Sequence, residues 1–137
     1  MTDGWTERRR YAATEHAAAQ RKVRAADSQR ARALIAQFIE SVLVSGLDPV
    51  PLRARGYGGH ATYRTGLRGW LLHTDGRMAI GTDGEFYLLS VPASMRGRLT
   101  GVQLEAQDPP LQVGRGAGDG ESISLAELLQ RALDGRP

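Results

Sequence analysis

The sequence predicts an α+β fold, in which an antiparallel β-meander sheet of four to six strands packs against an amphipathic N-terminal helix and a short C-terminal helix. Three observations predict it. Two Asp-Gly pairs, at 75–76 and 83–84, separate apolar runs in the middle of the chain. A long segment without Gly or Pro precedes them. A short segment with helical apolar spacing ends the chain.

The two Asp-Gly pairs predict tight turns, because a type I′ turn needs positive φ at both central residues and Asp-Gly tolerates it. They predict three antiparallel strands near 68–74, 77–82 and 85–91, with Ile80 opposite Tyr87 and Met78 opposite Leu89. One face then carries Leu71, His73, Met78, Ile80, Tyr87, Leu89 and Val91. The other carries Trp70, Leu72, Ala79, Phe86 and Leu88. Since neither face is polar, each must be covered or must meet a partner.

Segment 28–45 is predicted to form the helix that covers one face of the sheet. Its apolar residues recur at helical spacing and form one stripe: Leu34, Ile35, Phe38, Ile39, Val42 and Leu43. Gly46 is a suitable C-cap residue, and Pro49 and Pro51 prevent continuation of the helix. We expect strands near 50–55 and 61–65 in the connection that follows.

The C-terminal third predicts a further strand over 98–105, a short edge strand at 111–113 and a final helix over about 124–134. Ser122 or Ser124 is expected to cap its N-terminus, and Glu127, three residues past Ser124, has the spacing of a capping box. Residues 28–137 are therefore expected to form a single α+β domain.

Residues 1–27 are predicted to form a basic helical arm. Its apolar content is mostly alanine, which gives too thin a stripe to pack on a core. Six cations crowd it: Arg8, Arg9, Arg10, Arg21, Lys22 and Arg24. Three interpretations stay open: a solvated extension, an arm that orders on an anionic surface, and a helix that pairs with a copy of itself.

A second basic element lies in the stretch between Asp48 and Asp75, which contains no acidic residue. Arginine there alternates with aromatic residues and glycine, as in loops that hold phosphates and stack bases. The candidate nucleic-acid-binding residues of this element are Arg53, Arg55, Tyr57, Arg64 and Arg68. The alternative is a long connection whose tyrosines pack on the sheet.

The sequence offers no recognisable catalytic or metal chemistry. It has no cysteine, and no two of its three histidines have the i, i+4 spacing of a metal site. No serine lies in a G-x-S-x-G elbow. We therefore expect no cofactor and no metal. The absence of cysteine and of a membrane-spanning apolar run favours a cytoplasmic protein with no membrane partner.

Three functional hypotheses follow. The leading one is a small non-enzymatic binding protein that contacts RNA, DNA or a ribonucleoprotein through the basic arm and the Gly/Arg/Tyr loop. The second is a protein-interaction module or homodimer that uses the apolar sheet face of Trp70, Leu72, Phe86 and Leu88. The third is an enzyme or small-molecule binder whose pocket is formed by Tyr57, His60, Tyr63 and His73, which requires these four side chains to converge.

Overall fold

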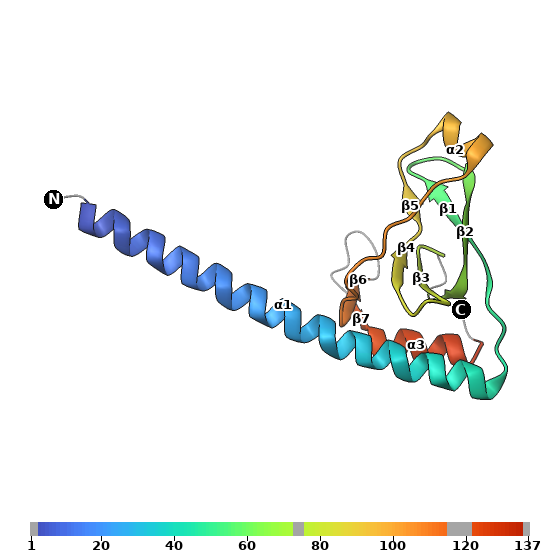
Figure 1. Cartoon of the computed structure of the whole chain (residues 1–137), viewed down its shortest axis with the longest axis horizontal. Helices are drawn as coiled ribbons and strands as arrows, with labels where there is room; N and C mark the ends of the chain where they lie inside the picture. The colour runs from blue at the N-terminus through green and yellow to red at the C-terminus, as the bar shows by residue number, and fades with distance from the viewer. Residues whose placement is uncertain (1–2, 73–75, 115–121, 136–137) are drawn as a thin grey trace.

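A computed structural model describes residues 3–72, 76–114 and 122–135 of the chain, and it has the expected α+β class (Figure 1). The helices are α1 (Asp3–Ser45), α2 (Met95–Thr100) and α3 (Leu125–Leu133). The strands are β1 (Val50–Gly56), β2 (Thr62–Leu71), β3 (Met78–Gly81), β4 (Phe86–Leu88), β5 (Ser90–Val91), β6 (Gln112–Gly114) and β7 (Ser122–Ser124). None of these helices is both long and apolar enough to cross a membrane.

Helix α1 is a single unbroken helix of 43 residues, about 65 Å long, that continues through Asp27 and Ser28. Its first buried residue is Ala31. The preceding residues, 4–30, leave the body of the domain and reach about 40 Å into solvent (Figure 1). We call residues 4–30 the projecting arm. The projecting arm and the segment expected to cover the sheet belong to the same helix.

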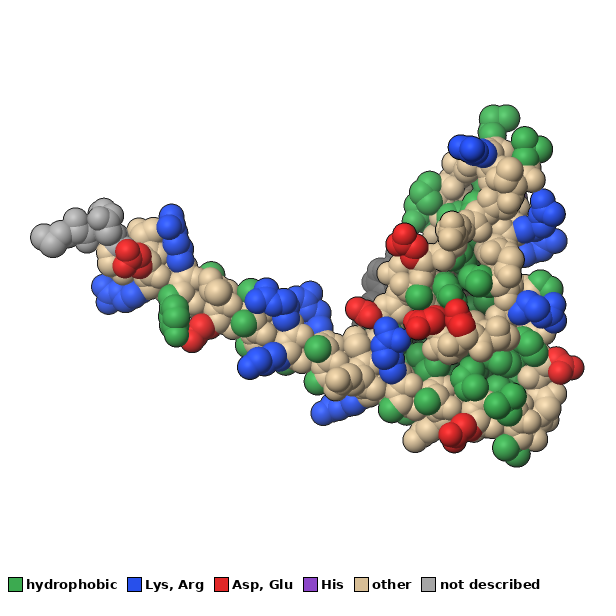
Figure 2. All heavy atoms as spheres, in the orientation of Figure 1, with side chains coloured by type: hydrophobic (Ala, Val, Ile, Leu, Met, Phe, Trp, Pro, Cys, Tyr) green, Lys and Arg blue, Asp and Glu red, His purple; other side chains and the backbone are tan. Residues whose placement is uncertain are grey.

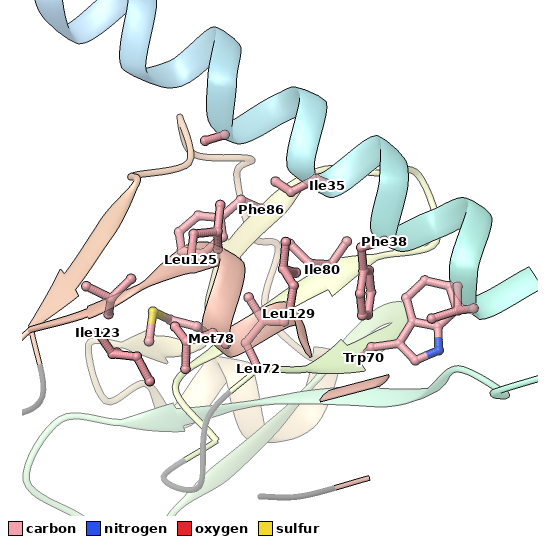
Figure 3. Packing of buried hydrophobic residues seen from close by; sticks show 14 residues of the cluster. Ile35, Phe38, Trp70, Leu72, Met78, Ile80, Phe86, Ile123, Leu125 and Leu129 are labelled. Carbon is pink, nitrogen blue, oxygen red and sulfur yellow. The ribbon is translucent and has the colours of Figure 1, made fainter. Parts of the chain in front are cut away.

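The C-terminal third of α1 packs on the sheet together with α3. Phe38 is 2% exposed and lies edge-on to Trp70, with 5.8 Å between the ring centroids. Figure 3 shows Phe38 directed from α1 toward Trp70 and Ile80. The Trp70 indole Nε1 donates a hydrogen bond to the Leu47 carbonyl at 3.1 Å, so its polar atom is satisfied at the edge of the core. Covering of one sheet face by segment 28–45 is confirmed, but Leu43, expected in its apolar stripe, is 75% exposed.

The main sheet is mixed, with the strand order β4-β3-β2-β1-β5. β1 pairs with β5 in parallel, while the other neighbours are antiparallel. Only Leu89 separates β4 from β5, although these strands lie at opposite ends of the order. Its carbonyl accepts a hydrogen bond from the Arg55 N–H and its own N–H donates to the Arg77 carbonyl, both at 2.7 Å. The sheet therefore curls until its two edges meet in one segment.

This curling produces two apolar cores, one on each face of the sheet. The first, between the sheet and helices α1 and α3, contains Trp70, Leu72, Met78, Ile80 and Phe86 from the sheet. The second, enclosed by the curled sheet, contains Leu52, Ala79, Tyr87 and Leu89, with Leu67 and Leu104 packed against it.

The strand register differs from the expected one by one residue. Ile80 pairs with Phe86, Met78 with Leu88, and Trp70 with Ile80. At the second turn, Gly81 N–H bonds to the Glu85 carbonyl and Gly84 has φ +80°, whereas no described non-glycine residue has positive φ. The connection is thus a three-residue loop ending in a left-handed glycine, and the predicted two-residue turn is wrong. The extra loop residue places Phe86 on the face of Ile80, and the pairing of Trp70 with Ile80 places Met78 and Ile80 on the face of Trp70.

The predicted strand at 98–105 is also wrong. Residues 95–100 form helix α2, capped by the Ser94 hydroxyl, which accepts a hydrogen bond from Gly97 N–H at 3.0 Å. Gly101, at φ +81°, then turns the chain away. The strand expected near 111–113 is β6, and it pairs with β7 in a small separate sheet. At the last helix, Ser124 accepts from Glu127 N–H at 3.1 Å, as its spacing predicted.

We expect stability to fall at high pH because of one buried phenol. The Tyr87 hydroxyl donates to Asp83 Oδ2 at 2.5 Å; this hydrogen bond, with burial and the nearby carboxylates, raises the Tyr87 pKa to about 12. Between pH 10 and 12 the unfolded chain loses this proton while the folded chain retains it, so the free energy of unfolding decreases, by about 3 kcal/mol at most. Urea titrations of wild type and Tyr87→Phe across this range check it. The variant should lose less stability than wild type, and parallel curves would contradict the assignment.

Candidate nucleic-acid interface

The net positive charge of the chain is concentrated on its first thirty residues. Residues 1–30 hold seven basic and four acidic residues, and the remaining chain holds eleven of each. All six cations expected on the basic arm are exposed on α1. At about 100° per residue, their side chains point to every side of the helix rather than along one stripe. Figure 2 shows basic side chains distributed along the whole arm.

Two arm cations have local partners. The Arg8 Nε donates to the Gly4 carbonyl at 3.1 Å, and the Arg9 guanidinium lies 3.9 Å from the centre of the Trp5 ring. Both contacts lie within one or two turns of the same helix. They order the side chains without neutralising their charge.

A polar contact fixes the arm where it leaves the domain. The Arg32 guanidinium bonds Asp108 at 3.1 Å and Glu85 at 3.4 Å. The hydrogen bond to Asp108, followed by that to Glu85, raises the Arg32 pKa. These exposed pairs contribute little to stability, but they link α1 to the β3–β4 turn and so orient the arm.

The second basic element is organised by β1 and β2. Along β1, Leu52, Ala54 and Gly56 are buried, so the alternating residues Arg53 and Arg55 face outward. On β2, Arg64 and Arg68 face outward too, and Arg53 lies directly opposite Arg64. We call the outward surface of Arg53, Arg55, Arg64 and Arg68 the arginine face. Basic side chains gather over β2 on the side of the domain away from the arm (Figure 2).

Two arginines of the arginine face donate hydrogen bonds to backbone carbonyls rather than to carboxylates. Arg64 donates to the Leu99 carbonyl at 3.2 Å and Arg68 to the Pro49 carbonyl at 3.0 Å. None of the four arginines forms an ion pair with any residue that the structure describes. Their charge therefore stays available to an external anion.

A depression of about 680 Å³ lies at the end of this surface, beside the β1–β2 loop. Tyr57 and His60, two members of the expected four-residue pocket, line it. The third, Tyr63, is 2% exposed inside the domain, where its hydroxyl accepts a hydrogen bond from Ser94 N–H at 2.9 Å. The fourth, His73, lies outside the described residues. The structure thus brings two of the four together and separates Tyr63 from them.

The apolar face expected to meet a partner is covered within the chain. Trp70, Leu72 and Phe86 are at most 9% exposed, because α1 and α3 pack on the face where they lie. Only Leu88, on strand β4, is exposed, at 47%. Three of the four residues therefore form no surface of the folded chain.

Three residues at the depression were not expected from the sequence: Thr62, Arg77 and Ser90. Arg55 pairs in register with Thr62 on one side and with Ser90 on the other. The parallel pairing of β1 with β5 brings Ser90 there, and local sequence spacing carries no signal for such a pairing. Arg77 directly follows the first Asp-Gly pair of the sequence, and that position was the available signal.

Among the residues with described coordinates, no group of three or more His, Asp or Glu side chains could hold a metal ion. Comparison with protein-family models, with curated proteins and with solved structures finds no match. The geometry and charge of the chain itself therefore indicate its function.

Proposed function

We propose that this chain is a non-enzymatic binding protein that contacts nucleic acid through the arginine face, with the projecting arm as a second contact. The observation that carries the proposal is the arrangement of Arg53, Arg55, Arg64 and Arg68 on one outward face without a carboxylate partner in the described part of the chain. Guanidinium groups bind phosphate through paired N–H donors, and phosphate contacts provide most of the affinity for nucleic acids.

The stability of the fold does not account for this arrangement. Arg53 faces Arg64 across two antiparallel strands, and like charges in directly opposite positions destabilise a sheet. An anion bound between the two guanidinium groups would relieve this repulsion. The repulsion that destabilises the free chain would then favour the binding of a polyanion.

The projecting arm supports the proposal in a different way. Its exposed cations point in all directions and lie about 10–35 Å along the helix from the first buried residue, so the arm and the arginine face meet different stretches of a polymer. A long flexible anion reaches both. The arm is therefore expected to add affinity that depends on salt, without selecting a sequence.

We expect the triple variant Arg21→Gln, Lys22→Gln and Arg24→Gln to weaken binding to a long single strand. Each cation that contacts a phosphate contributes about 0.7 to the slope of log affinity against log salt, so the slope should fall by about 2. Fluorescence anisotropy at several salt concentrations measures it.

Glutamine is a good helix former, so the circular dichroism of this variant should match that of wild type. An unchanged salt slope would exclude the arm from the interface. Wild-type binding that does not depend on salt, or that is absent for every nucleic acid, would reject the proposed function.

A further inference from the structure

The loop between β1 and β2 holds an exposed aromatic ring on a fixed backbone. The Gly56 N–H bonds the Ala61 carbonyl at 3.0 Å and closes the loop, which turns at Gly58 with φ +66°. The Tyr57 N–H bonds the Val91 carbonyl of β5 at 2.9 Å, yet the Tyr57 residue is 63% exposed. A solvent-facing ring on a hydrogen-bonded backbone beside a depression can stack on a nucleic-acid base.

The wall of the same depression carries a row of anion-binding groups. Arg55 on β1 lies between Thr62 on β2 and Ser90 on β5. Neighbouring strands are about 4.8 Å apart, so the three residues form a row across the sheet. Arg77 also lines the depression. A guanidinium flanked by two hydroxyls provides several donors to one phosphate group. Among the residues that the structure describes, those lining the depression include no acidic side chain.

Arg55 belongs both to this row and to the arginine face. A polyanion that follows Arg53 and Arg64 along the two strands is therefore led to the depression. From these contacts we infer that the depression binds one nucleotide of a single-stranded nucleic acid, with its phosphate at Arg55, Thr62 and Ser90 and its base stacked on Tyr57. The inference rests on the proposed function and adds its ligand class, because bases stacked within a duplex cannot reach the ring.

The test compares Tyr57→Leu with Tyr57→Phe, using one fluorescently labelled strand as DNA, as RNA and annealed to its complement. Loss of one base–aromatic stack should weaken single-strand binding about 5-fold to 150-fold in Tyr57→Leu. The slope against salt should stay unchanged, because no charge is removed. Tyr57→Phe retains the ring and should bind as wild type does. Duplex binding should be the same for all three proteins.

A second variant, Arg55→Gln, separates the phosphate from the base. It should lower the salt slope by about 0.7 on a single strand. If Tyr57→Leu binds the single strand with wild-type affinity, or loses as much affinity for the duplex as for the single strand, the inference is overturned. The proposed function would still be supported in that case if binding depended on salt through Arg53 and Arg64. A wild-type chain that binds neither strand nor duplex rejects both.

Discussion

Replacement of Phe38 by alanine should lower the free energy of unfolding by about 3–5 kcal/mol. Phe38 is 2% exposed, and its ring fills the space between α1 and the indole of Trp70. Alanine leaves a cavity that α1 cannot close without losing its other contacts with the sheet. Since domains are stable by only about 5–15 kcal/mol, a large part of the total would be lost. Urea denaturation followed by tryptophan fluorescence measures it.

Leu43→Ala, five residues further along the same helix, is the matched control. Leu43 is 75% exposed, so the loss should stay below about 0.5 kcal/mol. Both variants introduce alanine into α1, so they differ mainly in the burial of the side chain that is removed. Equal losses in the two variants would mean that α1 does not present the Phe38 side to the sheet.

The parts of the fold that follow from local chemistry could be predicted. The apolar stripe of 28–45, the capping serine at 124 and the glycine of the second hairpin turn are each marked by residue type and spacing. The arginine-rich surface could also be predicted, because side chains alternate along a strand and Arg53 and Arg55 therefore lie on the same side. These features depend on residues within one or two turns or strand repeats of one another.

The register and the closure of the sheet could not be predicted in this way. Asp-Gly occurs in both two-residue and three-residue turns, and at the second turn this difference of a single residue decides whether Ile80 pairs with Phe86 or with Tyr87. The pairing of β1 with β5 joins residues 55 and 90, and nothing near either residue marks it. The register difference reassigned Met78 and Ile80, whereas Trp70, Leu72 and Phe86 lie on one face as expected; the expectation of a protein interface failed because α1 and α3 cover that face. Ser90 was missed because of the pairing of β1 with β5.

The double variant Arg53→Gln, Arg64→Gln should weaken nucleic-acid binding about tenfold or more, since each lost charge-assisted contact to phosphate contributes more than a neutral hydrogen bond. The salt slope on single strands should fall by about 1.4, that is, by about 0.7 for each cation. Fluorescence anisotropy over a range of salt concentrations measures both. A control with the same change in net charge places glutamate at two exposed alanines, Ala36→Glu and Ala126→Glu, on α1 and α3.

The same double variant should be more stable than wild type, and this opposite sign distinguishes a binding surface from a structural one. Arg53 and Arg64 face each other, so removal of their repulsion should raise the free energy of unfolding by about 0.2–1 kcal/mol. A structural role predicts the reverse, because Arg64 also donates to the Leu99 carbonyl and its loss would loosen α2. Weaker binding with higher thermal stability would mean that the fold retains these charges for a partner. Weaker binding with lower stability would attribute the effect to local unfolding.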